Sequence, residues 1–589
     1  MSVLHTSTAD RSASKAWLRA LELTARIPKN PERILANVVS EFADMLVERP
    51  ALLSEQECLT YGQLIIRSNR YSRWALHHGI AKGDTVCLFM PNRPEYLAIW
   101  LGITAVGGVV SLLNTNLSGL SLAHCINIVR PTHLILSSDL ADSMTTALSA
   151  LERPVEMWVH DDEILNYSGD PLTGGEKRLI TIYDRALCIY TSGTTGLPKA
   201  ANVSHFRLMQ WSHWFAGMMD SGPSDRMYNC LPMYHSVGGV VATGAVLVSG
   251  GSVVIREKFS ATEFWKDITR WDCTLFQYIG ELCRYLLHTS PCTDETDHRV
   301  RICCGNGMGA DVWNDFKTRF HIPSILEFYA ATEGSFSLYN IEGKPGSIGR
   351  IPSFLAHRFP VSLVQFDVEE GVPIRNAAGF CVPCLPDEIG EAIGKIATDP
   401  TQPGGRFEGY TSAQASERKI LRDVFEPGDA WFRTGDLMRK DKKGYFYFVD
   451  RIGDTFRWKG ENVATSEVSE AIRAFPGIQE ANTYGVAIPG TDGRACMAAI
   501  TLAGQLDLVA LRNHLIARLP SYARPLFLRI HSELETTSTF KYTKTSLVSE
   551  GYDPAKIPNL AYFNDPERHA FVPLDHQLFE RIQTGRMRF

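Results

Sequence analysis

The sequence predicts an α/β protein with a large N-terminal domain and a small α/β C-terminal domain. Short β-branched runs alternate with helix-like segments over most of the chain, which is typical of a largely parallel sheet with helices on both faces. The pattern changes after about residue 440, where a compact aromatic strand precedes further strands and an amphipathic helix. We therefore expect a domain of residues 1–449, itself subdivided, and a domain of residues 450–589.

Six β-branched runs are expected to form strands of the large domain: residues 85–89, 133–136, 187–190, 253–255, 274–278 and 299–303. Two apolar segments between them could be mistaken for membrane spans. Residues 96–113 carry no charge, but Gly107-Gly108 and the β-rich run after it indicate a buried helix that leads into a strand. Residues 237–255 are interrupted by glycines, so we predict no confident span there either.

The small domain is predicted from the segments after a turn at residues 441–444. Residues 445–449 are expected to form an aromatic strand, and two further strands are expected at residues 483–488 and 495–501. Residues 506–519 have the pattern of an amphipathic helix.

The composition is typical of a globular protein. Of the 589 residues, 44% are hydrophobic and 21% are charged, which excludes collagen-like, wholly disordered and disulfide-scaffold proteins. The 59 Lys and Arg residues against 65 Asp and Glu residues give a net charge of −6. This balance argues against a protein that holds nucleic acid by bulk electrostatics, so no nucleic-acid partner is expected.

The cysteines and the chain ends bear on localisation. The 13 cysteines are scattered, and the C-x-x-C pair Cys381 and Cys384 lacks the second pair that a two-knuckle zinc site needs. Reduced thiols are therefore expected. Residues 1–30 lack the apolar run of a signal peptide, and residues 586–589 are not a peroxisomal Ser-Lys-Leu signal. We expect an intracellular protein, cytoplasmic or associated with an organelle such as the peroxisome or the ER surface.

The strongest chemical signal is the segment of residues 190–199, in which a predicted strand ends at Tyr190. Four hydroxyl residues and two glycines follow, and a Pro-Lys pair ends the segment. The residues expected to bind phosphate are Thr191, Ser192, Gly193, Thr194, Thr195, Gly196 and Lys199. Glycine lets backbone N–H groups approach an anion, hydroxyls add hydrogen bonds and lysine supplies charge. The segment therefore predicts a phosphate-binding loop, different from the kinase and GTPase P-loop in its spacing.

This loop and three further motifs resemble the adenylate-forming superfamily of acyl-CoA synthetases, luciferases and peptide-synthetase adenylation domains. The motifs are residues 276–287, residues 457–463 and Thr539-Phe540-Lys541. They are most similar to the fatty acid transport protein / very-long-chain acyl-CoA synthetase branch, and the resemblance spans residues 59–554. It implies a large multi-subdomain adenylation domain, a mobile C-terminal domain, and an ATP-dependent ligase that uses Mg²⁺ and coenzyme A and forms acyl-AMP.

The resemblance also implies individual roles in binding Mg·ATP. Glu333, beside Thr332, is the expected Mg²⁺ ligand, because Mg²⁺ prefers hard oxygen donors. Tyr329 and the turn of Gly305, Asn306 and Gly307 are expected beside adenine, although that turn alone mimics a dinucleotide fingerprint. Asp436 is expected to accept both ribose hydroxyls, and Arg451 to donate to ribose or phosphate oxygens.

Four residues are expected to act in catalysis or in the change between the two half-reactions. Lys541 would stabilise the charge that develops when a carboxylate attacks the α-phosphate. His235 would border the acyl pocket, and Gly460 would lie where the CoA arm approaches. Asp450 would be the hinge about which the small domain rotates.

Three alternatives stay open at this point. The enzyme could load a carrier-protein thiol instead of CoA, it could act in fatty acid uptake through CoA trapping, or it could bind nucleotide without turnover. The acyl group is expected to be long or very long, or a branched, sterol-derived or specialised-metabolite carboxylate. The sequence leaves open peripheral membrane association and the oligomeric state.

Overall fold

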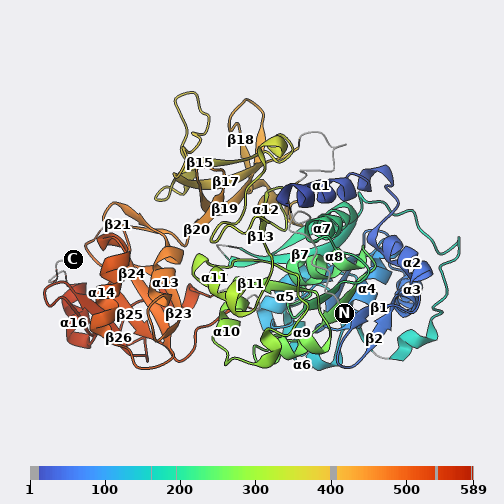
Figure 1. The fold of residues 1–589 in the computed structure, drawn as a ribbon, viewed down its shortest axis with the longest axis horizontal. Coiled ribbons are helices and arrows are strands. Elements are labelled where there is room, and N and C mark those ends of the chain that lie inside the picture. The colour runs from blue at the N-terminus through green and yellow to red at the C-terminus, as the bar shows by residue number, and fades with distance from the viewer. Residues whose placement is uncertain are drawn as a thin grey trace, which may run out of the picture. The chain divides into compact units, whose positions relative to one another are not determined.

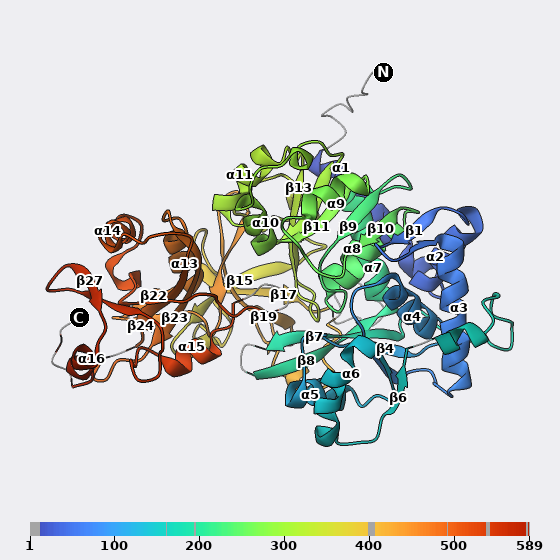
Figure 2. The same ribbon diagram turned by 90° about the horizontal axis from the view of Figure 1, so that it is seen from below.

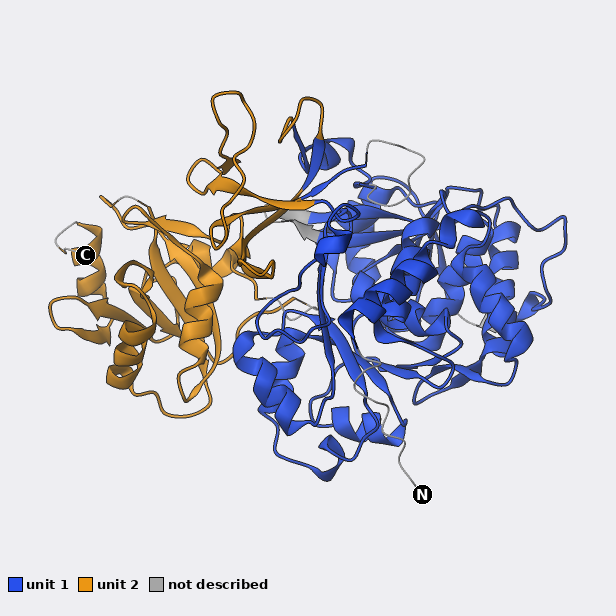
Figure 3. Ribbon diagram, turned by 45° about the horizontal axis from the view of Figure 1, so that its top comes forward, with its two compact units in different colours: residues 1–360, 394–422, 430–432 blue, residues 361–393, 423–429, 433–589 orange. Residues whose placement is uncertain are grey.

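The computed structural model describes residues 12–160, 162–193, 196–397, 407–491, 493–537, 542–584 and 587. The chain divides into two compact units (Figure 3). Unit 1 contains residues 1–360, 394–422 and 430–432, and unit 2 contains residues 361–393, 423–429 and 433–589. The second unit therefore includes segments before residue 450, and the domain boundary at residues 449–450 stays a prediction.

Unit 1 contains a sheet in which all strand pairs except the two outer ones are parallel. In the described part of the chain, eight strands follow the order β14-β13-β12-β11-β9-β10-β1-β2. Strands β13, β11, β1 and β2 of this sheet are labelled in Figure 1. They are β1 (Pro50–Leu53), β2 (Cys58–Thr60), β9 (Arg226–Asn229), β10 (Ser252–Ile255), β11 (Leu275–Ile279), β12 (Ile302–Asn306), β13 (Ile325–Ala330) and β14 (Ser337–Asn340).

A second sheet of unit 1 has the order β6-β5-β3-β4-β7-β8, and only β7 and β8 pair antiparallel. Its strands are β3 (Thr85–Phe89), β4 (Val109–Leu112), β5 (His133–Leu136), β6 (Glu156–Val159), β7 (Arg185–Gly193) and β8 (Gly196–Ser204). Val86 and Leu88 of β3 belong to the main core, whereas Cys87 and Phe89 belong to a core on the opposite face. Burial on both faces explains why this strand is a continuous apolar run.

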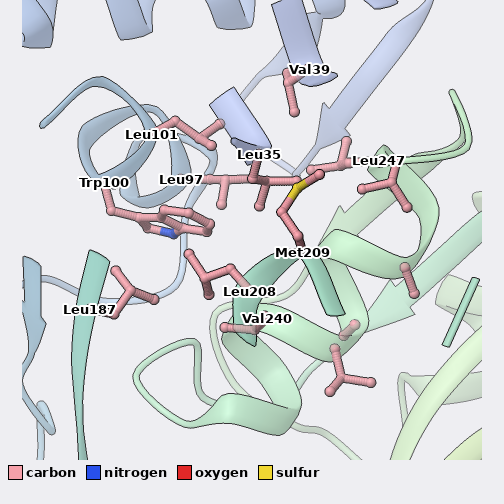
Figure 4. Packing of buried hydrophobic residues seen from close by; sticks show 14 of the residues in the cluster. Leu35, Val39, Leu97, Trp100, Leu101, Leu187, Leu208, Met209, Val240 and Leu247 are labelled. Atoms are coloured by element: carbon pink, nitrogen blue, oxygen red, sulfur yellow. The ribbon is translucent and has the colours of Figure 1, made fainter. Parts of the chain in front are cut away.

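Helices cover both faces of the second sheet. Helices α5 and α6, labelled in Figure 2, share a core with Cys87 and Phe89 on one face of the sheet. Helices of the main core, part of which Figure 4 shows, cover the other face. The helices of unit 1 are α1 (Ala13–Thr24), α2 (Leu35–Met45), α3 (Tyr61–His77), α4 (Pro94–Ala105), α5 (Gly119–Val129), α6 (Ala141–Ala147), α7 (His205–Met219), α8 (Ala242–Leu247), α9 (Phe264–Arg270), α10 (Gly280–Leu287), α11 (Ala310–Arg319) and α12 (Ala413–Glu417).

Helix α4 is buried on all sides, which confirms the interpretation of residues 96–113 as a core helix followed by a strand. In Figure 4, its Leu97, Trp100 and Leu101 lie among apolar side chains of other elements. Gly102 permits the close contact with α3, because a Cβ there would lie 2.3 Å from the Ser68 carbonyl oxygen. An apolar helix of this kind marks the centre of a large domain.

The later part of the chain forms a third sheet and a C-terminal sheet. The third sheet, of order β16-β15-β17-β19-β18 with β20 on β19, contains β15 (Val361–Asp367), β16 (Val372–Pro373), β17 (Ile389–Lys395), β18 (Ile420–Arg422), β19 (Ala430–Lys440) and β20 (Phe446–Arg451). The C-terminal sheet follows the order β23-β24-β25-β26-β27, with β23 (Ile478–Val486), β24 (Ala495–Leu502), β25 (Phe527–Ile530), β26 (Ala561–Asp565) and β27 (Ala570–Pro573).

The C-terminal sheet and its helices enclose a core of their own. The helices are α13 (Thr465–Arg473), α14 (Leu508–Arg518), α15 (Thr545–Glu550) and α16 (His576–Gln583), and a separate hairpin joins β21 (Phe456–Trp458) to β22 (Glu461–Val463). A core of apolar helices and strands is what a small α/β unit needs to be stable.

Candidate active site

The predicted phosphate loop is the turn of the β7–β8 hairpin. Strand β7 does not end at Tyr190 but continues to Gly193, because Thr191 pairs with Lys199 and Gly193 pairs with Gly196 across the hairpin. Ser192 lies in β7 and Gly196 begins β8, whereas Thr194 and Thr195 lie outside the described residues. The hairpin thus carries the Thr191 hydroxyl and the Lys199 ammonium group side by side.

Glu333 and Lys199 meet at one tyrosine, Tyr410. The Tyr410 hydroxyl donates a hydrogen bond to Glu333 Oε1 at 2.5 Å, and Lys199 Nζ lies 5.6 Å from the centre of the Tyr410 ring. The Thr191 side chain also forms a hydrogen bond with Tyr410. Burial is the largest cause that raises the pKa of Tyr410, and the Glu333 carboxylate raises it further. Tyr410 therefore keeps its proton and holds the buried carboxylate beside the hairpin.

An arginine of α7 fixes the loop that carries Thr332 and Glu333. Arg207 NH1 donates to the carbonyl oxygens of Thr332 at 2.7 Å and Gly334 at 3.0 Å. Its guanidinium also lies 3.6 Å from Glu408, whose carboxylate accepts hydrogen bonds from the backbone N–H and the hydroxyl of Ser204. Arg207 is 6% exposed, so these contacts are made largely away from water.

Thr332 links this loop to the segment that carries His235. The Thr332 and Ser236 hydroxyl oxygens lie 3.3 Å apart. His235 itself is half-buried, packs against the Tyr234 ring and precedes a π-helical turn over Val237–Val241. Turns of this kind occur frequently at functional sites.

The predicted adenine turn begins inside a strand. Gly305 and Asn306 pair with β11 as the last residues of β12, and Gly307 follows with a φ of +86°. A Cβ at Gly305 would lie 2.2 Å from the Tyr278 carbonyl oxygen, so only glycine fits there. Asn306 Oδ1 is buried and has no hydrogen-bond partner among the described residues. Tyr329, on the neighbouring strand β13, is half-buried with its ring 5.5 Å from Phe336.

Beneath this turn lies a buried carboxyl group, Glu327. Its Oε1 accepts a hydrogen bond from the Gly307 N–H, and its Oε2 accepts one from the Tyr278 hydroxyl at 2.5 Å. Burial raises the pKa of Glu327 to about 8, and the hydrogen bonds oppose that shift. Glu327 therefore ties the adenine turn to two strands of the sheet.

We expect Glu327→Gln to flatten the pH dependence of stability. Folding raises the pKa of Glu327 from 4.5 to about 8. The folded state consequently binds more protons than the unfolded state between these pH values, and stability falls as the pH rises through this range. The neutral amide of Gln does not titrate, so it removes this decrease in the free energy of unfolding, which amounts to about 1.4 kcal/mol per pH unit. Urea unfolding across the range measures the effect, and parallel profiles for the two proteins would contradict it.

Unit 2 contains the residues predicted to bind ribose. Asp436 lies within β19, which continues to Lys440 and pairs with β20. Asp436 pairs with Arg451 across these strands, and the Arg451 Nε atom lies 3.9 Å from Asp436 Oδ1. This adjacency supports the prediction that Asp436 and Arg451 bind the same nucleotide.

Asp450 and Gly460 also lie in unit 2. Asp450 is 3% exposed, and its carboxylate accepts hydrogen bonds from the N–H of Thr465 at 2.6 Å and from the Thr465 hydroxyl at 3.1 Å. Gly460 forms the tip of the β21–β22 hairpin with Lys459, at φ values of +83° and +53°. Two positive φ values in sequence are typical of a type I′ turn.

Lys541 lies outside the described residues, so its role stays a prediction. Sequence reasoning missed three residues that complete the cluster around Glu333: Tyr410, Arg207 and Glu408. No motif marks them, because each lies far along the chain from the residues that it contacts. Only Tyr410, after Gly409, carries a weak signal as an aromatic residue that follows a turn.

Comparison with known proteins places the chain in a family. The family described as "AMP-binding enzyme" matches residues 39–374, and the "AMP-binding enzyme C-terminal domain" matches residues 467–541. Long-chain fatty acid transport protein 6 of Mus musculus is 39% identical over 570 residues, which cover 93% of this chain and 91% of that protein.

Solved structures share the fold at lower identity. The anthranilate CoA ligase AuaEII in complex with anthranoyl-AMP aligns with a TM-score of 0.73 at 20% identity, over 88% of this chain and 97% of that chain. ATP-bound MatB from Rhodopseudomonas palustris aligns with a TM-score of 0.73 at 21% identity, over 89% and 100%. Within the described ranges, no helix combines the length and apolarity that crossing a bilayer requires. The chain belongs to the AMP-binding enzyme family, the adenylate-forming acid–thiol ligases, as the sequence predicts.

Proposed function

We propose that this enzyme joins a long-chain carboxylic acid to coenzyme A at the expense of ATP, through an acyl-AMP intermediate. The observation that carries the proposal is the cluster in which Tyr410 joins Glu333 to Lys199 and Thr191. A buried carboxylate beside a lysine and a hydroxyl-rich hairpin suits a metal–triphosphate complex, because the cation and the anion each meet opposite charge.

The donors around Glu333 fit Mg²⁺. Glu333 Oε2 accepts no hydrogen bond from the described residues, since the Tyr410 hydroxyl donates only to Oε1. Glu333 and the Thr332 hydroxyl would hold the ion, which would offset the negative charge of the triphosphate when bound. Lys199 and the hairpin N–H groups would orient the phosphates.

In the first half-reaction, a carboxylate oxygen of the substrate attacks the α-phosphorus of ATP. The bond from that phosphorus to the bridging oxygen breaks, and pyrophosphate leaves. Tyr329, Gly305, Asn306 and Gly307 would hold adenine, and the buried Asn306 Oδ1 offers an acceptor to the adenine amino group. Asp436 and Arg451 would bind the ribose, and Lys541 would stabilise the charge on the α-phosphate.

In the second half-reaction, the CoA sulfur attacks the acyl carbon, AMP leaves and the thiol proton passes to solvent. Gly460 at the hairpin tip would border the CoA arm. Asp450 would act as the hinge between the half-reactions. The backbone of Asp450 pairs with Leu437 of β19, and its side chain accepts hydrogen bonds from Thr465 at the start of α13. Asp450 thus links the third sheet to a helix of the C-terminal core, which supports its proposed place at the hinge.

The acyl chain length is inferred from the relatives. Proteins that are 39% identical to this chain are named long-chain fatty acid transport proteins, and we extend that substrate class to this enzyme. His235 would border the acyl pocket together with the apolar segment after it. Gly239 in that segment packs so tightly that a Cβ would lie 1.9 Å from the Met233 carbonyl oxygen.

Pyrophosphate release with a series of carboxylic acids tests the proposal. We expect the highest kcat/KM for long aliphatic chains, release that depends on ATP, and acyl-CoA as the product identified by mass spectrometry. An acylated carrier protein in place of acyl-CoA would favour the carrier-loading alternative. Nucleotide binding without pyrophosphate release from any acid would overturn the proposed function.

A further inference from the structure

Two histidines and a glutamate gather at the edge of the second sheet of unit 1, away from the cluster around Glu333. His78 caps the C-terminal end of α3, His133 begins β5 and Glu156 begins the edge strand β6. His133 and Glu156 are direct register partners in parallel strands, so their side chains project from the same face. The potential ligand atoms of the three side chains all lie within 4.8 Å of one another.

Each histidine lies from the Glu156 carboxylate at about the distance that separates two ligand atoms of one zinc ion. His78 Nδ1 lies 3.4 Å from Glu156 Oε1, and His133 Nε2 lies 3.3 Å from Glu156 Oε2. A tetrahedral zinc ion with ligands at about 2.0–2.1 Å separates its ligand atoms by about 3.3–3.4 Å. The two histidines contact different oxygens of the carboxylate, and all three ligand atoms lie within 4.8 Å of one another, so rotation of the exposed Glu156 side chain would bring them onto one ion.

His133 directs a buried ring nitrogen at the Glu156 carboxylate without forming a hydrogen bond to it. Its side chain is 9% exposed, and its Nε2 atom, which faces Glu156, is buried without a hydrogen-bond partner among the described residues. Its other ring nitrogen, Nδ1, lies 2.9 Å from Thr132 Oγ1. If Nδ1 donates this hydrogen bond, the Nε2 lone pair points to the cluster, as in metal sites whose ligands are oriented by a second hydrogen bond.

We propose that His78, His133 and Glu156 form a Zn²⁺ site that fastens the end of α3 to the edge of the second sheet. Two imidazoles and a carboxylate are a typical donor set for Zn²⁺, whereas Mg²⁺ and Ca²⁺ prefer oxygen donors alone. Glu156 is 64% exposed, so water can enter and complete the coordination. The three ligands come from segments that are distant in sequence, and the bound ion stabilises their contact.

Zinc titration of the chelator-treated, full-length protein tests this site. We expect wild type to bind one more Zn²⁺ than Glu156→Gln and His133→Gln by calorimetry and elemental analysis, or to bind it at least about tenfold more tightly. Because Glu156 is mostly exposed, Glu156→Gln should fold normally, which the Tm with chelator present verifies. Zinc should raise the Tm of wild type and not that of Glu156→Gln.

Two further variants separate this site from others. His576→Gln alters an exposed histidine of α16 and should bind zinc as wild type does. Glu333→Gln should also keep this zinc ion, which distinguishes the site from the proposed Mg²⁺ site. The proposal is overturned if wild type binds no zinc at micromolar concentration, or if Glu156→Gln and His133→Gln bind it like wild type. The cluster would then be a pair of histidine–carboxylate ion contacts.

Discussion

Glu333→Gln is expected to lower the kcat/KM of adenylation by roughly 100-fold or more, measured by ATP–pyrophosphate exchange. The amide keeps the shape of the side chain and still accepts the Tyr410 hydrogen bond, but it removes the negative charge. If Glu333 holds Mg²⁺, the loss should be accompanied by a higher Mg²⁺ concentration at half-maximal rate. The Tm should change little, because a neutral group costs less to bury than a charged one.

Two other variants make this result specific. Tyr410→Phe removes the hydroxyl that positions Glu333 but leaves its charge, so we expect a smaller loss, about tenfold, from one hydrogen bond to a charged group. Glu417→Gln alters a carboxylate that is 61% exposed and paired with Arg422, and it should react like wild type. An unchanged Mg²⁺ dependence in Glu333→Gln would remove Glu333 from the metal site.

The sequence predicted the buried strands of the first part of the chain well. Strands β3 and β5 have the predicted bounds, because each is a short β-branched run that the sheet buries on both faces. Strand β12 was predicted at residues 299–303 but spans Ile302–Asn306. Gly305 and Asn306 resemble loop residues by type, and pairing with Tyr278 and Ile279 draws them into the sheet. Tertiary pairing thus overrides local preference.

The candidate site was predicted only where its residues form contiguous motifs. Thr332 and Glu333 are adjacent in the sequence and form a recognisable motif. Lys199 ends the segment rich in Ser, Thr and Gly that forms the β7–β8 hairpin. Tyr410 lies 77 residues from Glu333, and Arg207 lies 125 residues from Thr332. Such partners are set by the packing of α7 and of the segment after residue 407, and no local pattern records them. The ordinary charge balance of the chain carries no sign of this concentration of charged groups either.

The proposed assignment of Lys541 to the first half-reaction and Gly460 to the second can be tested with one variant of each residue. Lys541→Ala is expected to lower the rate of adenylation by about 100- to 1000-fold, because it removes the cation that we propose stabilises charge on the α-phosphate. Conversion of supplied acyl-AMP and CoA to acyl-CoA should stay within about tenfold of wild type, since Lys541 is not proposed to take part in that step. Lys556→Ala, which alters a lysine that is 62% exposed in the same part of the chain, should preserve both rates.

Substitution at Gly460 should have the reciprocal effect. A Cβ atom added at Gly460 would meet no other atom within 4 Å, so Gly460→Leu should fold, with a cost of about 1–2 kcal/mol for its φ of +83°. If the CoA arm passes this tip, the leucine should slow thioester formation from acyl-AMP and leave ATP–pyrophosphate exchange intact. A loss confined to adenylation in Lys541→Ala and to thioester formation in Gly460→Leu would agree with the separate roles that we propose for these two residues. Equal losses in both half-reactions for either variant would contradict the assignment of Lys541 to adenylation or of Gly460 to thioester formation.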